Sequence, residues 1–149
     1  RELAALLKRE LRSPQSRLMV EGEPGGELFV LLNGNCQVVK EGAEGGSQIL
    51  ADLDPPGCFG EMSFFHAAPV SASVLATSQV EVLVLSHETF EAWMRSGSHA
   101  PQKIAWNTIA VLAERLRRMD EWTCQLVGKQ GKVDEWQEFR ASVYSTWLK

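Results

Sequence analysis

The residues best suited to binding a ligand lie in one stretch, Phe59–Ala76, which reads FGEMSFFHAAPVSASVLA. Gly60 allows a close approach of the backbone, and Glu61 to Phe65 can form one helical turn with free N–H groups at its start. A helix start flanked by small hydroxyl residues can hold an anionic or polar ligand. After Pro69 the chain re-enters a strand-like run, Ser71–Ala76. The stretch therefore predicts a cradle for an anionic or polar ligand.

Chemistry at a metal or a catalytic centre has little support in the sequence. The cysteines and histidines are Cys36, Cys58, Cys124, His66, His87 and His99. They show no CxxC, HxH or HExxH spacing, so we predict no metal site and no enzyme such as a cupin-like metal protein. Three widely spaced cysteines without a secretory signal favour reduced thiols, and we predict a cytoplasmic protein.

The composition is that of an ordinary globular protein. The chain has 149 residues, of which 44% are hydrophobic and 23% charged, and its formal net charge is -4. That charge gives no general attraction to nucleic acid or to an anionic membrane. No run approaches the 18 or more apolar residues of a membrane span, so none is predicted.

The middle of the chain alternates short β-type runs with glycine, proline and asparagine. The predicted strands are Arg17–Val20, Leu28–Leu32, Cys36–Lys40, Gln48–Leu53, Ser71–Ala76 and Val80–Leu85. The Asn33-Gly34-Asn35 segment suits a tight hairpin that needs a positive φ, and Val80, Val82 and Val84 give one fully apolar strand face. Six short strands at this spacing indicate a sandwich, jelly roll or small barrel.

Helices are predicted on both sides of this β region. Arg1–Arg12 reads as a short amphipathic helix that ends before Pro14. Ser86 is an N-cap candidate for a helix over His87–Met94. A long helix is expected over Gln102–Val127, broken by Gly128 and Gly131, and an amphipathic helix over Val133–Leu148.

The long helix carries a heptad pattern. Its apolar positions alternate spacings of four and three: Ala105, Ile109, Leu112, Leu116, Met119, Thr123 and Leu126. A seam sustained for about three heptads indicates pairing between helices, and we predict a homodimer through it. The competing interpretation is that the seam packs against the β region of its own chain.

Several segments together resemble the cyclic-nucleotide-binding domain family. FGEM followed by Pro69 and Ala72-Ser73-Val74 is similar to the family's phosphate-binding cassette, whose usual pattern is FGE(L/M)(A/S)LL…PRxATV. VEGEPGGELFVLLNGNCQVV looks like its paired-strand signature, and DPPGCFGEM like its glycine-rich entry to the cassette. The glycines at matching intervals are Gly22, Gly34, Gly57 and Gly60. The resemblance covers about residues 1 to 122.

The resemblance implies a mainly β fold with flanking helices: an antiparallel, jelly-roll-like β-roll of the cyclic-nucleotide-binding type with a long C-terminal helix. We expect the β-roll over residues 1–100, the long helix over 101–127 and a further amphipathic helix over 132–149. In CRP-like members the long helix forms the homodimer interface. Those members continue into a helix-turn-helix domain, whereas the residues given after the long helix here predict one further helix and no reader of DNA.

The resemblance also implies a set of ligand residues. They are Gly60, Glu61, Met62, Ser63, Val70, Ser71 and Ser73. Glu61 would accept from a ribose 2′-hydroxyl, the backbone of residues 60, 62 and 63 would line the sugar-phosphate, and Ser71 would bond a phosphate oxygen. Ser73 would stand near the base. Three of these residues also have a structural explanation: Glu61 as a first-turn helix acid, and Ser71 and Ser73 as small residues tolerated in a strand against a tight turn.

One position departs from the family pattern, because its phosphate-binding arginine falls on Val70. A bidentate arginine supplies two charge-assisted hydrogen bonds of roughly 1.5–3 kcal/mol each. Its loss predicts a drop of about two or more decades in affinity. The other cations considered are His66 and, on the long helix, Arg115, Arg117 and Arg118.

These observations predict a non-catalytic regulatory or interaction module that does not bind cyclic AMP in the usual mode. The alternative is a genuine sensor of a cyclic nucleotide or another small molecule that signals through the C-terminal helix. A neutral or cationic ligand would not require an arginine. No cofactor is predicted, and a cyclic nucleotide is the ligand to test. The expected partners are a second copy or a protein that docks on the C-terminal helices, with no direct binding of nucleic acid.

Overall fold

The computed structural model describes residues 7–42, 45–66, 68–130 and 133–145. The chain divides into two compact units, Arg1–Gln102 and Lys103–Lys149. The first unit contains the strands and two short helices. The second contains most of one long helix and the helix that follows it.

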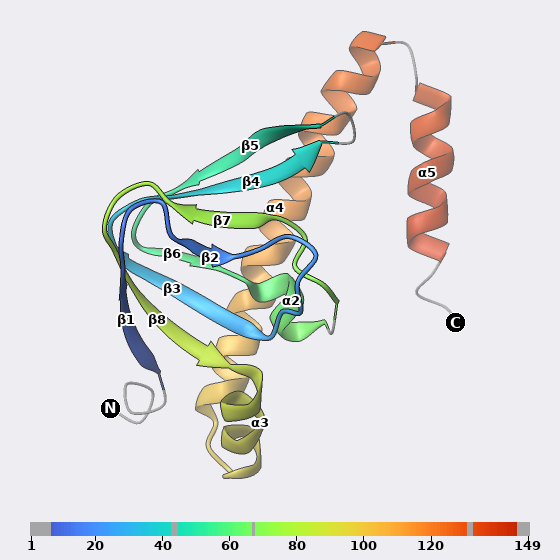
Figure 1. Ribbon diagram of the computed structural model, residues 1–149. Helices are drawn as coiled ribbons and strands as arrows, with labels where there is room; N and C mark the ends of the chain where they lie inside the picture. Colours follow the sequence, from blue (N-terminus) through green and yellow to red (C-terminus); the bar gives the residue numbers. More distant parts are fainter. Residues whose placement is uncertain (1–6, 43–44, 67, 131–132, 146–149) are drawn as a thin grey trace. The chain divides into compact units, whose positions relative to one another are not determined.

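Two four-stranded antiparallel sheets make up the first unit (Figure 1). One sheet has the order β1-β8-β3-β6, with β1 at Lys8–Arg12, β8 at Val80–Ser86, β3 at Glu27–Asn33 and β6 at Gly57–Phe59. The other has the order β2-β7-β4-β5, with β2 at Arg17–Met19, β7 at Ser73–Ala76, β4 at Cys36–Gly42 and β5 at Gly46–Leu53. This is the predicted antiparallel β-roll.

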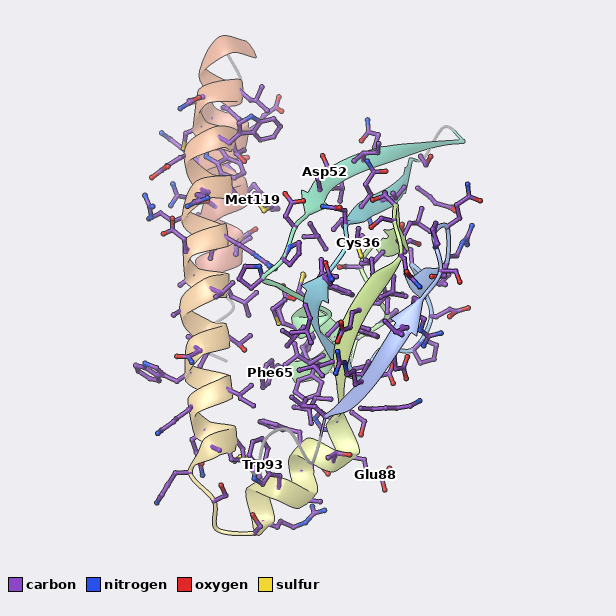
Figure 2. The ribbon with its side chains drawn as sticks, turned by 90° about the vertical axis from the view of Figure 1, so that its left-hand side faces the viewer. Cys36, Asp52, Phe65, Glu88, Trp93 and Met119 are labelled. Carbon is purple, nitrogen blue, oxygen red and sulfur yellow. The ribbon has the colours of Figure 1, made fainter. Side chains whose placement is uncertain are left out.

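The hydrophobic core is built from residues of both sheets. Its buried members are Phe29, Leu31, Cys36, Phe59, Val74, Ala76, Val80, Val82 and Val84. The alternation predicted for β8 is confirmed, because Val80, Val82 and Val84 are all buried. Phe29 and Phe59 stack with their ring centroids 5.0 Å apart, and Figure 2 shows Cys36 in this interior. Burial of these side chains supplies the main favourable term in folding.

Two short helices hold the cassette against the β-roll. α2 spans Glu61–Phe65 and α3 spans His87–Arg95, as the sequence predicted to within a residue. Ser86 caps α3, because its hydroxyl oxygen accepts from the backbone N–H of Thr89 at 3.2 Å. The rings of Phe64 and Phe90 meet edge to face, with centroids 5.2 Å apart, so α2 and α3 share an aromatic contact.

The second unit is helical. α4 spans Ala100–Gln130 and α5 spans Val133–Ser145. A guanidinium nitrogen of Arg140 lies 3.5 Å from a carboxylate oxygen of Asp120, which links α5 to α4. None of the described helices is long and apolar enough to cross a membrane.

Two predictions about helices are wrong in the described residues. The predicted N-terminal helix is a strand over Lys8–Arg12, where β1 pairs antiparallel with the edge of β8. Its backbone groups thus pair with another strand, and Leu11, placed on an apolar helix face, is 68% exposed. Residues 1–6 lie outside the described residues.

The predicted break at Gly128 is absent, because α4 continues to Gln130 and an interior glycine costs only about 1 kcal/mol. The predicted break at Gly131 lies outside the described residues.

The turn at Gly34 provides a test of the fold. Gly34 and Gly97 both have φ of 79°, but an added Cβ at Gly34 would overlap the carbonyl oxygen of Gln79, whereas the space around Gly97 is open. We expect Gly97→Ala to lower the free energy of unfolding by about 1–2 kcal/mol, the cost of left-handed backbone. Gly34→Ala should cost at least about 1 kcal/mol more, because the overlap adds to that cost. Urea unfolding measures both, and equal losses would contradict this account of the hairpin.

Candidate functional site

The start of α2 depends on a glycine. Gly60 precedes α2 with φ of 87°, and a Cβ there would overlap the carbonyl oxygen of Glu27. The same Cβ position lies 3.3 Å from the sulfur of Met19. Of the three residues that follow, Glu61 and Ser63 are buried, and Met62 is 58% exposed. The sequence was therefore right that Gly60 permits a close backbone approach.

The segment that joins β2 to β3 pairs with the cassette through its backbone. The N–H of Val70 donates to the carbonyl of Glu23 at 2.9 Å, and the N–H of Gly22 donates to the carbonyl of Val70 at 2.9 Å. Pro24 and Pro69 form an isolated bridge beside them. The side chain of Val70 is only 5% exposed. Position 70 is thus fixed from both sides and carries an apolar, buried side chain.

The two predicted serines lie in different surroundings. The Ser73 hydroxyl oxygen accepts from the backbone N–H of Glu21 at 2.9 Å, and Ser73 is buried. Ser71 is exposed, and its hydroxyl lies 3.7 Å from the sulfur of Met62. Ser73 therefore has a structural bond to the β2–β3 segment, and Ser71 remains accessible.

Sequence reasoning missed a cation at the cassette. The Lys40 ammonium, on β4, donates to the carbonyl of Ser71 at 2.7 Å and to the Glu21 carboxylate at 2.7 Å. Lys40 lies far from the cassette in sequence, and only the pairing of β4 with β7 brings it there. The one available signal was the prediction of both strands, which does not give their register.

The Lys40–Glu21 pair changes the acidity of its carboxylate. The hydrogen bond from Lys40, followed by the backbone N–H of Glu41 at 3.0 Å, lowers the pKa of Glu21. A carboxyl whose pKa is lower in the folded state adds stability above its unfolded pKa. That contribution disappears as the pH falls through the folded value.

Two hollows lie along the β2–β3 segment. The first has a volume of about 230 Å³ and is lined by Leu18, Met19, Val20, Glu23, Pro24, Gly25, Glu27, Phe29 and Val70. The second, of about 330 Å³, is lined by Gly22, Pro24, Gly25, Ser63, Ala68 and Pro69. Val70 therefore faces the first and Ser63 the second. Gly60, Glu61, Met62, Ser71 and Ser73 line neither, so these two hollows do not unite the predicted ligand residues.

The alternative cations considered from the sequence have other surroundings. His66 is exposed at the end of α2, where its backbone N–H donates to the carbonyl of Met62 at 3.2 Å. Arg117 and Arg118 both pair with Glu114 on their own helix, at 2.8 Å. In the described part of the chain, no three His, Cys, Asp or Glu side chains are grouped to hold a metal.

Comparison with known proteins agrees with the fold. The model of the cyclic nucleotide-binding domain matches residues 11–96. The chain belongs to this family. It is 33% identical over 108 residues to the cyclic AMP receptor protein of Thermus thermophilus, covering 72% of this chain and 48% of that protein. It is 24% identical over 110 residues to a CRP-like cAMP-activated global transcriptional regulator of Mycobacterium tuberculosis, covering 74% and 47%.

Solved structures of the family show the same fold. The catabolite activator protein of Thermus thermophilus has a TM-score of 0.74 and 30% identity, over 84% of this chain and 57% of that one. A cyclic nucleotide-binding domain from Methylobacillus flagellatus has a TM-score of 0.75 and 26% identity, over 79% and 66%. This family member spans about half the length of the curated relatives it matches.

The Lys40–Glu21 pair gives a pH prediction. Lys40→Met should raise the pKa of Glu21 toward its ordinary value, because the hydrogen bond from Lys40 is the largest cause of its lowering. The variant should then lose less stability than the wild type as the pH falls through the acid range. Carbon-13 NMR titration of the Glu21 carboxyl measures the first effect, and Lys40→Arg, which keeps the charge, is the control. An unchanged Glu21 pKa in Lys40→Met would contradict the assignment.

Proposed function

We propose that this chain is a non-catalytic regulatory module of the cyclic-nucleotide-binding family that does not bind cyclic AMP in the usual mode. The observation that carries the proposal is the burial and fixed position of Val70. The residue stands where the family pattern has its phosphate-binding arginine, its side chain is 5% exposed, and its backbone is bonded on both sides. A valine held in this way offers no charge and no hydrogen-bond donor to a phosphate.

The charges around position 70 support the same conclusion. Glu23 and Glu27 line the hollow beside Val70. Lys40, the cation that donates to Ser71, already pairs with Glu21, so the two charges compensate each other. An incoming phosphate would meet carboxylates and one engaged ammonium. Coulomb repulsion between anions then adds to the loss of the arginine contact.

A cyclic AMP titration by calorimetry tests this proposal. The wild type should show no saturable heat up to millimolar ligand, because the missing arginine contact is worth about two decades or more of affinity. Val70→Arg should gain binding if the rest of the cassette is intact, and its thermal melting checks that it folds. Micromolar binding of cyclic AMP or cyclic GMP by the wild type would overturn the proposal.

One observation favours a second function, that of a genuine cyclic-nucleotide sensor. The Lys40 ammonium lies 2.7 Å from the carbonyl of Ser71, the residue expected to bond a phosphate oxygen. Release of Lys40 from Glu21 would supply a cation beside Ser71. Binding by the wild type that Lys40→Met abolishes would establish this function in place of the first.

We further propose that the chain forms a homodimer through the heptad seam of α4. Ile109, Leu116 and Met119 belong to this seam and are 59%, 59% and 65% exposed on the single chain. Apolar side chains at heptad spacing gain most by packing against a matching helix. A protein docked on α4 and α5 is the other expected partner. We propose no direct nucleic-acid contact, given the net charge of -4, and a cytoplasmic location that rests on the reduced thiols.

Paired charge substitutions on α4 test the dimer. Leu116→Glu places a carboxylate in the seam and should weaken dimerisation at least about tenfold, since a buried leucine contributes about 1.5–3 kcal/mol. Gln125→Glu adds the same charge nine residues later, on the opposite side of the helix, and should leave the dimer intact. Sedimentation equilibrium measures both. A monomeric wild type, or equal effects of the two variants, would contradict the seam as the interface.

A further inference from the structure

We propose that the hollow beside Val70 binds a small organic cation, a guanidinium or alkylammonium group carried on a short apolar body. This acidic hollow is the first of the two described above, with a volume of about 230 Å³. The inference rests on the proposed function, because it takes the cassette to have lost its preference for a phosphate. It adds the class of ligand that the altered site accepts.

Both charged residues that line the acidic hollow are glutamates. Glu23 and Glu27 are its only ionisable lining residues, and no lysine, arginine or histidine lines it. Within the described residues, neither carboxylate has an ion pair or a side-chain hydrogen bond. The nearby pair of Lys40 and Glu21 is neutral overall and does not line the hollow. Both carboxylates are exposed, so an ion pair with either one adds modestly to the affinity of a cation.

Apolar side chains form part of the wall of the acidic hollow, beside its two glutamates. Leu18, Met19, Phe29 and Val70 line it with hydrocarbon, aromatic and thioether groups. The volume of 230 Å³ exceeds the roughly 150 Å³ of an apolar cavity that takes up benzene. A ligand with a short apolar body can therefore bury that body while its charged end stays beside the carboxylates. Apolar walls with a few placed polar groups are typical of small-molecule sites.

The side chain at position 70 affects both the volume of this hollow and the charge beside it. Val70 is short, so it forms a wall and leaves the volume open. It is neutral, so it supplies no cation to Glu23. A long basic side chain at position 70 would fill the same space and supply that cation. The substitution that removes the arginine thus creates a place for a cation from outside.

Occupancy of the acidic hollow would act on the cassette. Glu23 lines the hollow, and its carbonyl accepts from the N–H of Val70 at 2.9 Å. The segment that carries Glu23 runs beside α2 (Figure 1), and an added Cβ at Gly25 would overlap the side chain of Ser63. A bound cation would therefore stabilise the pairing of this segment with the cassette, because a ligand stabilises the state it binds.

The experiment uses two probes of similar shape, ethylguanidinium and the neutral ethylurea, at millimolar concentration. Amide NMR shifts of the intact chain report where each probe binds. We expect saturable shifts at residues 18–29 and 70 with ethylguanidinium, and affinity at least about tenfold lower for ethylurea, since only the first gains the charge interaction. Equal affinity for the two probes, or no saturable shift with ethylguanidinium, would overturn the proposal.

Variants locate the site. Glu23→Gln and Glu27→Gln should each weaken ethylguanidinium binding about threefold. This is the change in affinity that corresponds to losing an exposed charge pair worth about 0.7 kcal/mol. Val70→Leu, which narrows the hollow without adding charge, should weaken both probes. Glu88→Gln removes the same charge from exposed Glu88 on α3 (Figure 2) and should change nothing.

If Glu23→Gln and Glu27→Gln both bind ethylguanidinium as tightly as the wild type does, the assignment of the site is wrong. The cyclic AMP titration is independent of this result. If the wild type binds neither cyclic AMP nor ethylguanidinium, the proposed function stands and the cation site is wrong. Binding of cyclic AMP would reject the proposed function whatever ethylguanidinium does.

Discussion

The need to pair backbone groups beside the cassette constrains the whole binding region. The carbonyl and N–H of Val70 bond to Gly22 and Glu23, and the Ser73 hydroxyl bonds to the N–H of Glu21. Unpaired backbone groups in such a place would each cost about as much as a lost hydrogen bond. These bonds hold the β2–β3 segment against the start of β7. They also fix position 70, whose side chain lines the hollow.

The same region of the structure determines which charged side chains near the cassette are paired. Lys40 crosses from β4 to bond both Ser71 and Glu21, so the one ammonium described at the cassette supports the structure of the loop. Glu23 and Glu27 remain beside Val70 without such a partner among the described residues. A family fold whose cassette commonly receives an anion thus presents a negative surface at position 70. On the function proposed above, the scaffold is kept while the preference of its site changes, because that preference depends on a few side chains.

Local signals in the sequence predicted the elements that local chemistry determines. Gly60 ahead of α2, Ser86 as the cap of α3 and the valine alternation of β8 each follow from neighbouring residues, and the structure has all three. β1 could not be predicted in this way, since its identity as a strand comes from pairing with β8 about 70 residues later. Lys40 was missed for the same reason, because it reaches the cassette through the register of β4 with β7.

The composition of the hollow also lay beyond the sequence. Glu23 and Glu27 read as ordinary loop acids until the fold places them on one side of Val70. The family resemblance, in contrast, could be recognised from the spacing of glycines and the FGEM segment. It identified position 70 as the departure from the family pattern. What it could not supply was the electrostatic environment that decides the consequence.

The most direct test of the central claim is an amide NMR titration of the wild-type chain with cyclic AMP to millimolar concentration. It reads the cassette residues 60–63 and 70–73 individually. Our account predicts no saturable shift at these amides, because Val70 provides no cation and the hollow beside it is acidic. Saturable shifts across both segments at micromolar cyclic AMP would show that the cassette still binds the nucleotide and would contradict the account.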